Sequence, residues 1–324
     1  MTGTQELRRR QPRFLGLEPG HRACQGCGQA LAAALVTEAA GPDVILVNAT
    51  GCLEVFTTPW PQSAWRLPWI HSLFENAAAV AAGVEAALKR QGRPSKVLAF
   101  AGDGGTFDIG FRSLSGMIER HHEVLFVCFD NEAYMNTGVQ RSSSTPHAAA
   151  TTTSPAGRKL PGKRHLKKDL LAIVTAHHLP YAATATVAYP GDLMAKVRRG
   201  MATEGPAFLL VYSPCPLGWV HDPRDMIAVA RLAVETGIFP VVEFERGELV
   251  SVLPIREKKP VVEFLRLQGR FAHLLGDDPK ALEEREHLQA LADANIARFG
   301  LLARGEDERD TVSAARVRRG GRIR

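Results

Sequence analysis

The sequence predicts an α/β fold in which a mostly parallel β-sheet carries helices on both faces. Short apolar runs rich in β-branched residues alternate with helical stretches along the chain. These runs are continuously apolar over about five residues, as expected for parallel strands that are buried on both faces. Polar, Gly-rich or Cys-containing turns follow four of the runs, and open α/β sheets bind ligands at the carboxyl ends of their strands.

The strands and helices are expected in strict alternation. The expected strands cover residues 44–47, 97–100, 124–129, 182–187 and 207–212. The helices expected around them cover residues 29–39, 73–89, 111–120, 167–178 and 191–202. This order of elements is typical of one parallel sheet built from strand–helix–strand units.

Two segments do not fit this alternation. Residues 142–168 hold Ser, Thr, Pro, Gly and Lys with few apolar side chains, and they predict a long loop that is either functional or disordered. Residues 240–256 alternate in polarity around Arg246-Gly247, which indicates a β-hairpin. We therefore expect an N-terminal arm (1–18), a cofactor-binding domain (19–239), a small C-terminal hairpin and helical extension (240–304) and a polar, Arg-rich tail (305–324).

The composition is that of an ordinary globular protein of 324 residues, long enough for one large core and a modest extension. Its net charge of +6 comes largely from arginines near both ends, without interleaved aromatic residues or a nucleic-acid-binding motif, so nucleic acid is not an expected partner. No run approaches the roughly 18 apolar residues that span a bilayer, and the start lacks the apolar core of a signal peptide. We expect a cytoplasmic protein without a membrane span.

A Gly-Asp-Gly-Gly turn follows the expected strand at 97–100. It consists of Gly102, Asp103, Gly104 and Gly105, and 26 residues separate Gly104 from Asn131, which lies just past the next strand. A carboxylate and an amide oxygen at neighbouring strand ends can hold one divalent cation, and glycines let the backbone approach a diphosphate. Taken alone, the four residues could be an ordinary turn; the spacing to Asn131 favours a cation site.

Four of the five cysteines fall at positions that indicate a metal centre. Cys24 and Cys27 form a CxxC pair, Cys52 follows Cys24 by 28 residues, and Cys215 follows Cys52 by 163. Four thiolates can hold one [4Fe–4S] cluster. A structural zinc site is the alternative, although zinc sites usually pair two CxxC knuckles. The remaining Cys128 lies within an apolar strand and is expected to be a core residue.

The motifs resemble those of the β, thiamine-diphosphate-binding subunits of pyruvate and 2-oxoacid:ferredoxin oxidoreductases. The matching runs are GDGGTFDIGFRSLSGMIERHHEVLFVCFDNEAYMNTGVQRSSSTP from Gly102, HRACQGCGQAL from His21, NATGCLEVF from Asn48, PWIHSLFENAAAVAAGVEAAL from Pro68 and SPCPLGW from Ser213. Together they extend over roughly residues 19–248. The resemblance implies the thiamine-diphosphate-binding fold of the diphosphate-binding type for this domain.

The resemblance also implies a role for particular residues. It implies that Asp103, Asn131 and the carbonyl of Ala133 bind Mg²⁺, and that Cys24, Cys27, Cys52 and Cys215 bind a [4Fe–4S] cluster. Gly51, Cys52, Gly102, Gly104 and Gly105 would surround the diphosphate, and Asn136 would lie beside the reactive end of the cofactor. The family commonly has Glu where this chain has Gln29, which puts any acid–base role of that position in doubt.

Two further residues are candidates for catalysis. His71 and Glu75 lie in the PWIHSLFEN segment, next to an expected helix start. A packed, hydrogen-bonded histidine would explain His71 as well as a catalytic role would. The tryptophans Trp60, Trp65 and Trp69 are more typical of packing or of a subunit surface than of a substrate pocket.

The reaction implied by the resemblance is the oxidative decarboxylation of a 2-oxoacid, by default pyruvate, to acyl-coenzyme A and CO₂. Branched-chain and aromatic 2-oxoacids and oxalate stay open as substrates. The chain is long enough for one such α/β domain, so the pyrimidine-binding domain would come from an α subunit. Further clusters would sit on γ- or δ-type subunits that pass electrons to ferredoxin. A non-redox thiamine-dependent decarboxylase or synthase subunit and a zinc-stapled scaffold subunit are the alternatives of other classes.

Overall fold

The structure is a computed structural model that describes residues 14–157 and 160–303. Most of the expected N-terminal arm (1–18) and all of the expected polar tail (305–324) lie outside the described residues. None of the described helices combines the length with the apolar character that crossing a membrane requires.

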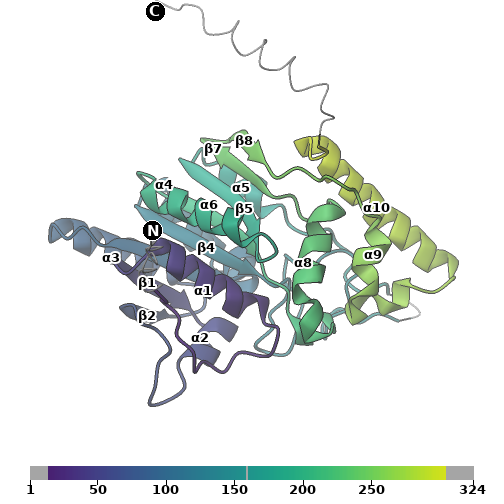
Figure 1. Ribbon diagram of the computed structural model, residues 1–324, viewed down its shortest axis with the longest axis horizontal. Coiled ribbons are helices and arrows are strands. Elements are labelled where there is room, and N and C mark those ends of the chain that lie inside the picture. The colour runs from purple at the N-terminus through teal and green to yellow at the C-terminus, as the bar shows by residue number, and fades with distance from the viewer. Residues whose placement is uncertain (1–13, 158–159, 304–324) are drawn as a thin grey trace, which may run out of the picture.

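The described residues form an eight-stranded sheet in the order β2-β1-β3-β4-β6-β5-β7-β8 (Figure 1). The strands are β1 (Val44–Ala49), β2 (Trp69–Ser72), β3 (Lys96–Gly102), β4 (Val124–Asp130), β5 (Tyr181–Thr186), β6 (Ala207–Tyr212), β7 (Val242–Glu245) and β8 (Glu248–Val252). The first six strands in the sheet run parallel, whereas β7 and β8 are antiparallel to their neighbours. The mostly parallel α/β sheet expected from the sequence is thus confirmed.

Helices cover both faces of this sheet. The described α-helices are α1 (Gly28–Ala40), α2 (Cys52–Thr57), α3 (Ala77–Arg90), α4 (Phe111–Glu119), α5 (Leu170–Thr175), α6 (Pro190–Ala202), α7 (Pro216–Trp219), α8 (Met226–Glu235), α9 (Val261–Arg266) and α10 (Pro279–Phe299). Alternate residues of a strand serve different cores: Val97 and Ala99 pack with α3 and α4, whereas Leu98 and Phe100 pack with α1 and α6. This two-sided burial explains why the strands are continuously apolar.

The segment from Trp69 to Asn76 differs from its expectation. Trp69–Ser72 forms the edge strand β2, and α3 begins at Ala77 rather than at residue 73. The four residues of β2 are too few to produce a periodic pattern, and the apolar side chains that follow them read as the start of the helix. The helix expected at 167–178 is also shorter, because Asp169 caps α5 by accepting a hydrogen bond from the Ala172 amide at 3.0 Å.

The segment 142–168 is a loop, as expected, but much of it is buried. Ser142, Ser144 and Thr145 are fully buried, and the Lys163 side chain is 2% exposed. The Lys163 ammonium donates to the Ser143 carbonyl at 3.0 Å and also to the Thr145 carbonyl. The loop therefore folds against the carboxyl ends of the strands, with its polar groups paired inside.

The expected hairpin is present as β7 and β8. Its turn places Arg246 and Gly247 at φ values of 51° and 86°, which matches the twist of a tight hairpin. Because β7 pairs with β5, the hairpin lengthens the main sheet instead of standing apart from it. The helices α9 and α10 lie together beside the sheet (Figure 1). The domain boundary at residue 240 stays a prediction.

Candidate functional site

A cavity of about 130 Å³ lies where the carboxyl ends of β1, β3 and β4 meet. Its walls come from the turns that follow these strands, from the start of α1 and from Phe74. The lining residues are Gln29, Asn48, Ala49, Thr50, Gly51, Cys52, Leu53, Phe74, Gly102, Asp103, Gly104, Asn131, Ala133, Tyr134, Met135, Asn136 and Thr137. Segments far apart in the sequence thus contribute to one concave site, the position at which open α/β sheets bind ligands.

Three oxygen atoms face one another at the base of this cavity. The side-chain oxygen of Asn131 lies 2.9 Å from Asp103 Oδ1 and 2.9 Å from the Ala133 carbonyl oxygen. All three are acceptors, so they repel one another unless a cation lies among them or the amide turns over to present its nitrogen. Neighbouring ligands of an octahedral Mg²⁺, each about 2.1 Å from the ion, lie about 3.0 Å apart. The donor set therefore fits a magnesium ion.

Asp103 is held in place by a buried hydroxyl. Its side chain is 1% exposed, and Ser142 Oγ donates to Asp103 Oδ2 at 2.5 Å, which leaves Oδ1 for the oxygen triad. Burial and then the charge of Asp130 raise the pKa of Asp103 well above its ordinary value. A divalent cation would offset both causes. Ser142 was not predicted as a site residue, although it lies in the run from Gly102 that resembles the family.

Two glycines are required by the backbone around the cavity. A Cβ atom at Gly104 would lie 2.5 Å from the Tyr134 ring, so only glycine lets these two segments approach. Gly51 has a φ of 155°, a conformation that other residues rarely adopt. Both positions agree with a site where the backbone comes close to a bulky ligand.

Two buried polar atoms on the cavity wall lack a partner. Gln29 Oε1 and Asn48 Nδ2 make no hydrogen bond, although both side chains are almost fully buried. A buried polar atom without a hydrogen-bond partner destabilises the folded protein unless a bound molecule supplies that partner. Together they offer one acceptor and one donor, which suits a polar heterocyclic ligand such as a thiamine cofactor. Asn48 was not predicted as a site residue, although it lies near the end of a buried strand and opens the NATGCLEVF run.

Three of the four candidate cluster cysteines lie at the amino ends of helices. Cys27 precedes α1, Cys52 begins α2, and Cys215 precedes α7 and accepts a hydrogen bond from the Gly218 amide at 3.4 Å. Backbone N–H groups at these ends favour negative charge and so suit an anionic cluster, although burial has the larger effect on the Cys27 thiol and raises its pKa. Cys24 is exposed, whereas Cys128 is buried in β4 as expected.

The four thiols are close enough to influence one another. Burial, and then the charges of neighbouring cysteines, raise the pKa of Cys52 to about 12; Asp103 adds to this shift. Burial also raises the pKa of Cys27 to about 11, with Cys215 and Cys24 contributing. Within the described ranges, no three His, Cys, Asp or Glu side chains are arranged to share one metal ion. In a [4Fe–4S] cluster each cysteine binds a different iron, so its ligands stand further apart than around a single zinc ion.

A buried network of charges supports the loop that carries Asn131. The Lys167 ammonium lies 2.6 Å from Asp130 Oδ2 and 2.9 Å from Glu132 Oε1, and Arg270 Nη2 lies 2.6 Å from Glu132 Oε2. Burial acts to raise the pKa of Glu132, but Lys167 and Arg270 outweigh it and lower the pKa. The network fixes the backbone on both sides of Asn131, and none of its members was predicted from the sequence.

Replacing Arg270 with methionine is expected to lower the free energy of unfolding by about 3–5 kcal/mol, because Glu132 would keep a buried charge with one cation fewer. The side chain of Arg270 is 3% exposed, which excludes water as a substitute partner. Arg298→Met is the matched control: Arg298 pairs with Asp169 at 2.6 Å, but both side chains are about half exposed. That change should cost about 1 kcal/mol or less. Urea titration of both variants checks the difference, and equal losses would contradict this role of Arg270.

The catalytic candidates lie in different places relative to the cavity. Asn136 lines it, at the exposed mouth. His71 does not line it but contacts its wall, with Nε2 2.7 Å from Thr50 Oγ1 and its ring stacked on Trp69. Glu75 is half-buried and does not line the cavity. The structure thus brings Asn136, but neither His71 nor Glu75, directly to the candidate site.

The three tryptophans of this region do not form one cluster. Trp65 packs on Phe100 in the core, Trp69 stacks on His71, and Trp60 is 94% exposed. Of the three, Trp60 alone has the exposure of a subunit surface residue.

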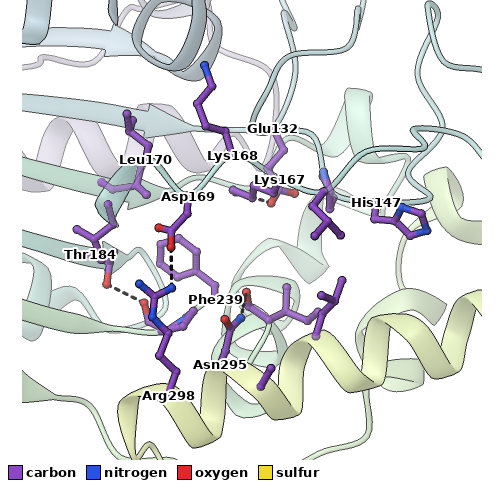
Figure 2. A pocket seen from close by; sticks show the side chains of 18 of the residues that line it. Glu132, His147, Lys167, Lys168, Asp169, Leu170, Thr184, Phe239, Asn295 and Arg298 are labelled. Carbon is purple, nitrogen blue, oxygen red and sulfur yellow. Dashed lines mark hydrogen bonds and ion pairs between the residues drawn. The ribbon is translucent and has the colours of Figure 1, made fainter. Parts of the chain in front are cut away.

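A second, larger cavity of about 270 Å³ lies between α10, α5 and the sheet (Figure 2). Its walls are mostly apolar, and its charged groups have partners: Asp169 pairs with Arg298, and Lys167 pairs with Glu132 (Figure 2). No residue predicted to bind a cofactor lines it. The smaller cavity at the strand ends is therefore the candidate functional site.

The chain is similar to several known proteins. Residues 49–211 match the thiamine pyrophosphate enzyme family, C-terminal TPP binding domain. The chain is 52% identical to the pyruvate synthase subunit PorB of Methanocaldococcus jannaschii over 281 residues, which cover 84% of this chain and 94% of the relative. It is 46% identical to the ketoisovalerate oxidoreductase subunit VorB of Pyrococcus abyssi over 288 residues, covering 85% and 92%.

A solved structure shares the fold. It is a 2-oxoglutarate:ferredoxin oxidoreductase from Magnetococcus marinus, which covers 96% of this chain with 98% of its own, at 20% identity and a TM-score of 0.58. This chain thus has a thiamine-diphosphate-binding domain and is similar along most of its length to 2-oxoacid oxidoreductase subunits. The chain belongs to the pyruvate/2-oxoacid:ferredoxin oxidoreductase family, as its β, thiamine-diphosphate-binding subunit.

Proposed function

We propose that this chain holds Mg²⁺ and thiamine diphosphate in the strand-end cavity and a [4Fe–4S] cluster on Cys24, Cys27, Cys52 and Cys215. The complex would oxidise a 2-oxoacid and coenzyme A to acyl-coenzyme A, CO₂ and a proton, with two electrons leaving through the cluster. The position of Cys52 is the observation that carries this proposal. Cys52 lines the candidate cavity, and it lies close enough to Asp103 and to the other three cysteines that their charges add to the effect of burial and raise the pKa of its thiol.

The site residues predicted from the sequence have proposed tasks. Asp103, Asn131 and the Ala133 carbonyl would hold Mg²⁺, while Gly51, Cys52, Gly102, Gly104 and Gly105 would border the diphosphate. Asn136 would lie beside the reactive carbon. When bound, thiamine diphosphate supplies the nucleophilic carbon and the electron sink for decarboxylation. His71 and Glu75 stay proposals as catalytic residues, and His71 could act on the cavity through Thr50.

Gln29 takes a positioning task in this proposal. Its amide cannot exchange a proton as a glutamate would, so it would orient the cofactor by hydrogen bonding. The unpaired Oε1 atom, buried on the cavity wall, supports this task.

Pyruvate is the first candidate for the 2-oxoacid, because relatives at 46–52% identity carry the name pyruvate synthase. A branched-chain 2-oxoacid is the second candidate, since a relative named ketoisovalerate oxidoreductase is 46% identical. Aromatic 2-oxoacids and oxalate complete the set to be tested. An assay of the assembled complex with this panel, by kcat/KM, distinguishes the candidates.

The proposed complex has several subunits. An α subunit would add the pyrimidine-binding domain, γ- or δ-type subunits would add further clusters, and ferredoxin or a similar low-potential acceptor would receive the electrons. A cytoplasmic location stays an expectation. The alternatives are a non-redox thiamine-dependent decarboxylase or synthase subunit and a zinc-stapled scaffold, and both would lack a redox cluster.

Metal analysis tests the proposal directly. The complex is purified anaerobically. This chain is expected to contribute about four irons to the total, beyond those bound by its partners, and no stoichiometric zinc. Cys215→Ala should remove these irons, because it deletes one of four ligands. Cys128→Ala is the matched control and should leave the iron content unchanged, because Cys128 is fully buried in β4, away from the cavity. One zinc and no iron on this chain would contradict the cluster.

A further inference from the structure

Trp219 contacts the loop of the proposed magnesium ligands. It is fully buried, and its indole Nε1 donates to the Asn131 carbonyl oxygen at 2.7 Å. Its own backbone amide donates to the Cys215 carbonyl oxygen at 2.9 Å, within the single turn of α7. One short helix therefore begins at a proposed cluster ligand and ends at a side chain that holds a proposed magnesium ligand.

The packing around α7 leaves it little freedom to move alone. A Cβ atom at Gly218 would lie 2.1 Å from Met135 Sδ, so the helix is in close contact with a residue that lines the cofactor cavity. On the other side, the Gly28 amide donates to the Pro214 carbonyl at 3.0 Å, which ties the residue before Cys215 to the start of α1 beside Cys27. Close-packed elements of this kind transmit displacements instead of absorbing them.

The indole is also held on its faces. The Arg270 guanidinium lies 4.0 Å from the centroid of the Trp219 ring, and the same guanidinium pairs with Glu132, the residue after Asn131. Tyr212, the last residue of β6, packs against the indole with ring centroids 5.2 Å apart. A displacement of Trp219 would therefore disturb Asn131 directly and Glu132 through Arg270.

From these contacts we infer that α7 couples the two cofactor sites, with Trp219 as the positioning residue. When the cluster is bound, the position of Cys215 is fixed, and so is that of α7, which begins next to it. Trp219 at the end of α7 then holds the Asn131 carbonyl, and with it the oxygen triad that receives Mg²⁺. Cluster loading then raises the affinity for Mg²⁺ and thiamine diphosphate, and by reciprocity bound cofactor stabilises the loaded cluster. This inference rests on the proposed function, since it requires both cofactors on this chain.

A double-mutant cycle in the assembled complex tests the coupling. Cys24→Ala removes a cluster ligand that lies outside α7, and Trp219→Phe keeps a ring but removes the indole N–H. Each single change is expected to raise the Kd of thiamine diphosphate, measured anaerobically by calorimetry with Mg²⁺, by about 5- to 20-fold. The Kd of thiamine diphosphate in the double variant should not exceed the larger of the two single-variant Kd values, because both changes interrupt the same coupling.

One further measurement and two further variants support this cycle. Trp219→Phe should keep the iron content of the wild type, which separates a positioning defect from loss of the cluster. Trp65→Phe is the matched control: Trp65 is also buried and donates its indole N–H, to Thr57 Oγ1 at 2.9 Å, but it does not line the cavity. Its Kd should equal that of the wild type. Gly218→Ala, which forces α7 against Met135, replaces Trp219→Phe in the cycle if the latter does not assemble.

The outcomes are distinct. Wild-type affinity in Trp219→Phe would overturn the inference, as would a double variant whose loss equals the product of the two single losses. If Trp65→Phe weakened binding as much as Trp219→Phe, a general effect of losing an indole would replace the specific coupling. A failure of the proposed function would already be visible in the wild type, as a complex whose β subunit binds no thiamine diphosphate or holds no iron.

Discussion

Replacing Asp103 with alanine is expected to abolish Mg²⁺-dependent binding of thiamine diphosphate, raising its Kd by at least about 100-fold. Asp103 brings the one carboxylate among the described residues that line the cavity. Without it, the oxygen triad loses its negative charge, and an amide and a carbonyl oxygen alone bind Mg²⁺ poorly. The diphosphate would then enter a site where its own charge is hardly neutralised. Calorimetry on the assembled complex, with and without Mg²⁺, measures the loss.

The cofactor-free protein should not unfold more easily after this change. Burial and the charge of Asp130 raise the pKa of Asp103, so the empty site holds its carboxylate at a cost. A thermal midpoint at or above that of the wild type would show that the fold is intact. Asp108→Ala is the matched control, because Asp108 lies in the short helical segment Gly104–Ile109 that follows Asp103 and accepts from Tyr134 at 3.0 Å, but does not line the cavity. It should keep most of the affinity. Full affinity in Asp103→Ala would instead remove Asp103 from the magnesium site.

The chain without its partners is expected to turn over a 2-oxoacid at least about 10²- to 10⁴-fold more slowly than the complex, the usual contribution of general acid–base catalysis. In thiamine enzymes an acidic residue of the pyrimidine-binding domain activates the aminopyrimidine, and here that domain is expected on an α subunit. Of the described cavity residues, none except Asp103 carries a carboxyl group, and Asp103 belongs to the proposed magnesium site. Large apolar side chains such as Trp60 and Leu73 are also exposed, so the lone chain should tend to self-associate.

Reduction of a low-potential acceptor, followed anaerobically, compares the partner-free chain with the co-expressed complex. Both preparations need equal iron and bound cofactor per β chain, so that the missing acid is the remaining difference. Equal rates would mean that the complete active site lies within this chain, and the need for an α subunit would be wrong.

The sequence predicted the sheet well because buried parallel strands leave a local trace. The apolar runs at 44–47, 97–100, 124–129 and 207–212 all fall within observed strands. The turns after the first three of these strands do line the candidate site, because neighbouring parallel strands end at the same edge of the sheet. The exception is β2, an edge strand of four residues whose mixed exposure produces no pattern.

The supporting contacts of the site could not be predicted in this way. Trp219 and Asn131 are 88 residues apart, and Arg270 and Glu132 are 138 apart, so no local pattern announces either pair. Ser142 was hidden for another reason: a stretch of Ser, Thr, Pro and Lys has the composition of a disordered segment. Its hydroxyls are nevertheless used inside the protein, where Ser142 donates to Asp103 and Ser144 donates to Asp130. Composition reports whether a side chain is polar, but not where it finds its partner.

These supporting contacts join residues that are far apart in the sequence, which also affects when the chain becomes able to bind its cofactors during synthesis. The turns at Asp103 and Asn131 leave the ribosome early, yet Asn131 gains its indole partner only after residue 219 has emerged, and Glu132 gains its guanidinium only after residue 270. A nascent chain that ends just before residue 270 has all eight described strands of the sheet but an incompletely supported loop around Asn131. Because domains generally fold as units during translation, the cofactors are expected to enter a nearly finished polypeptide.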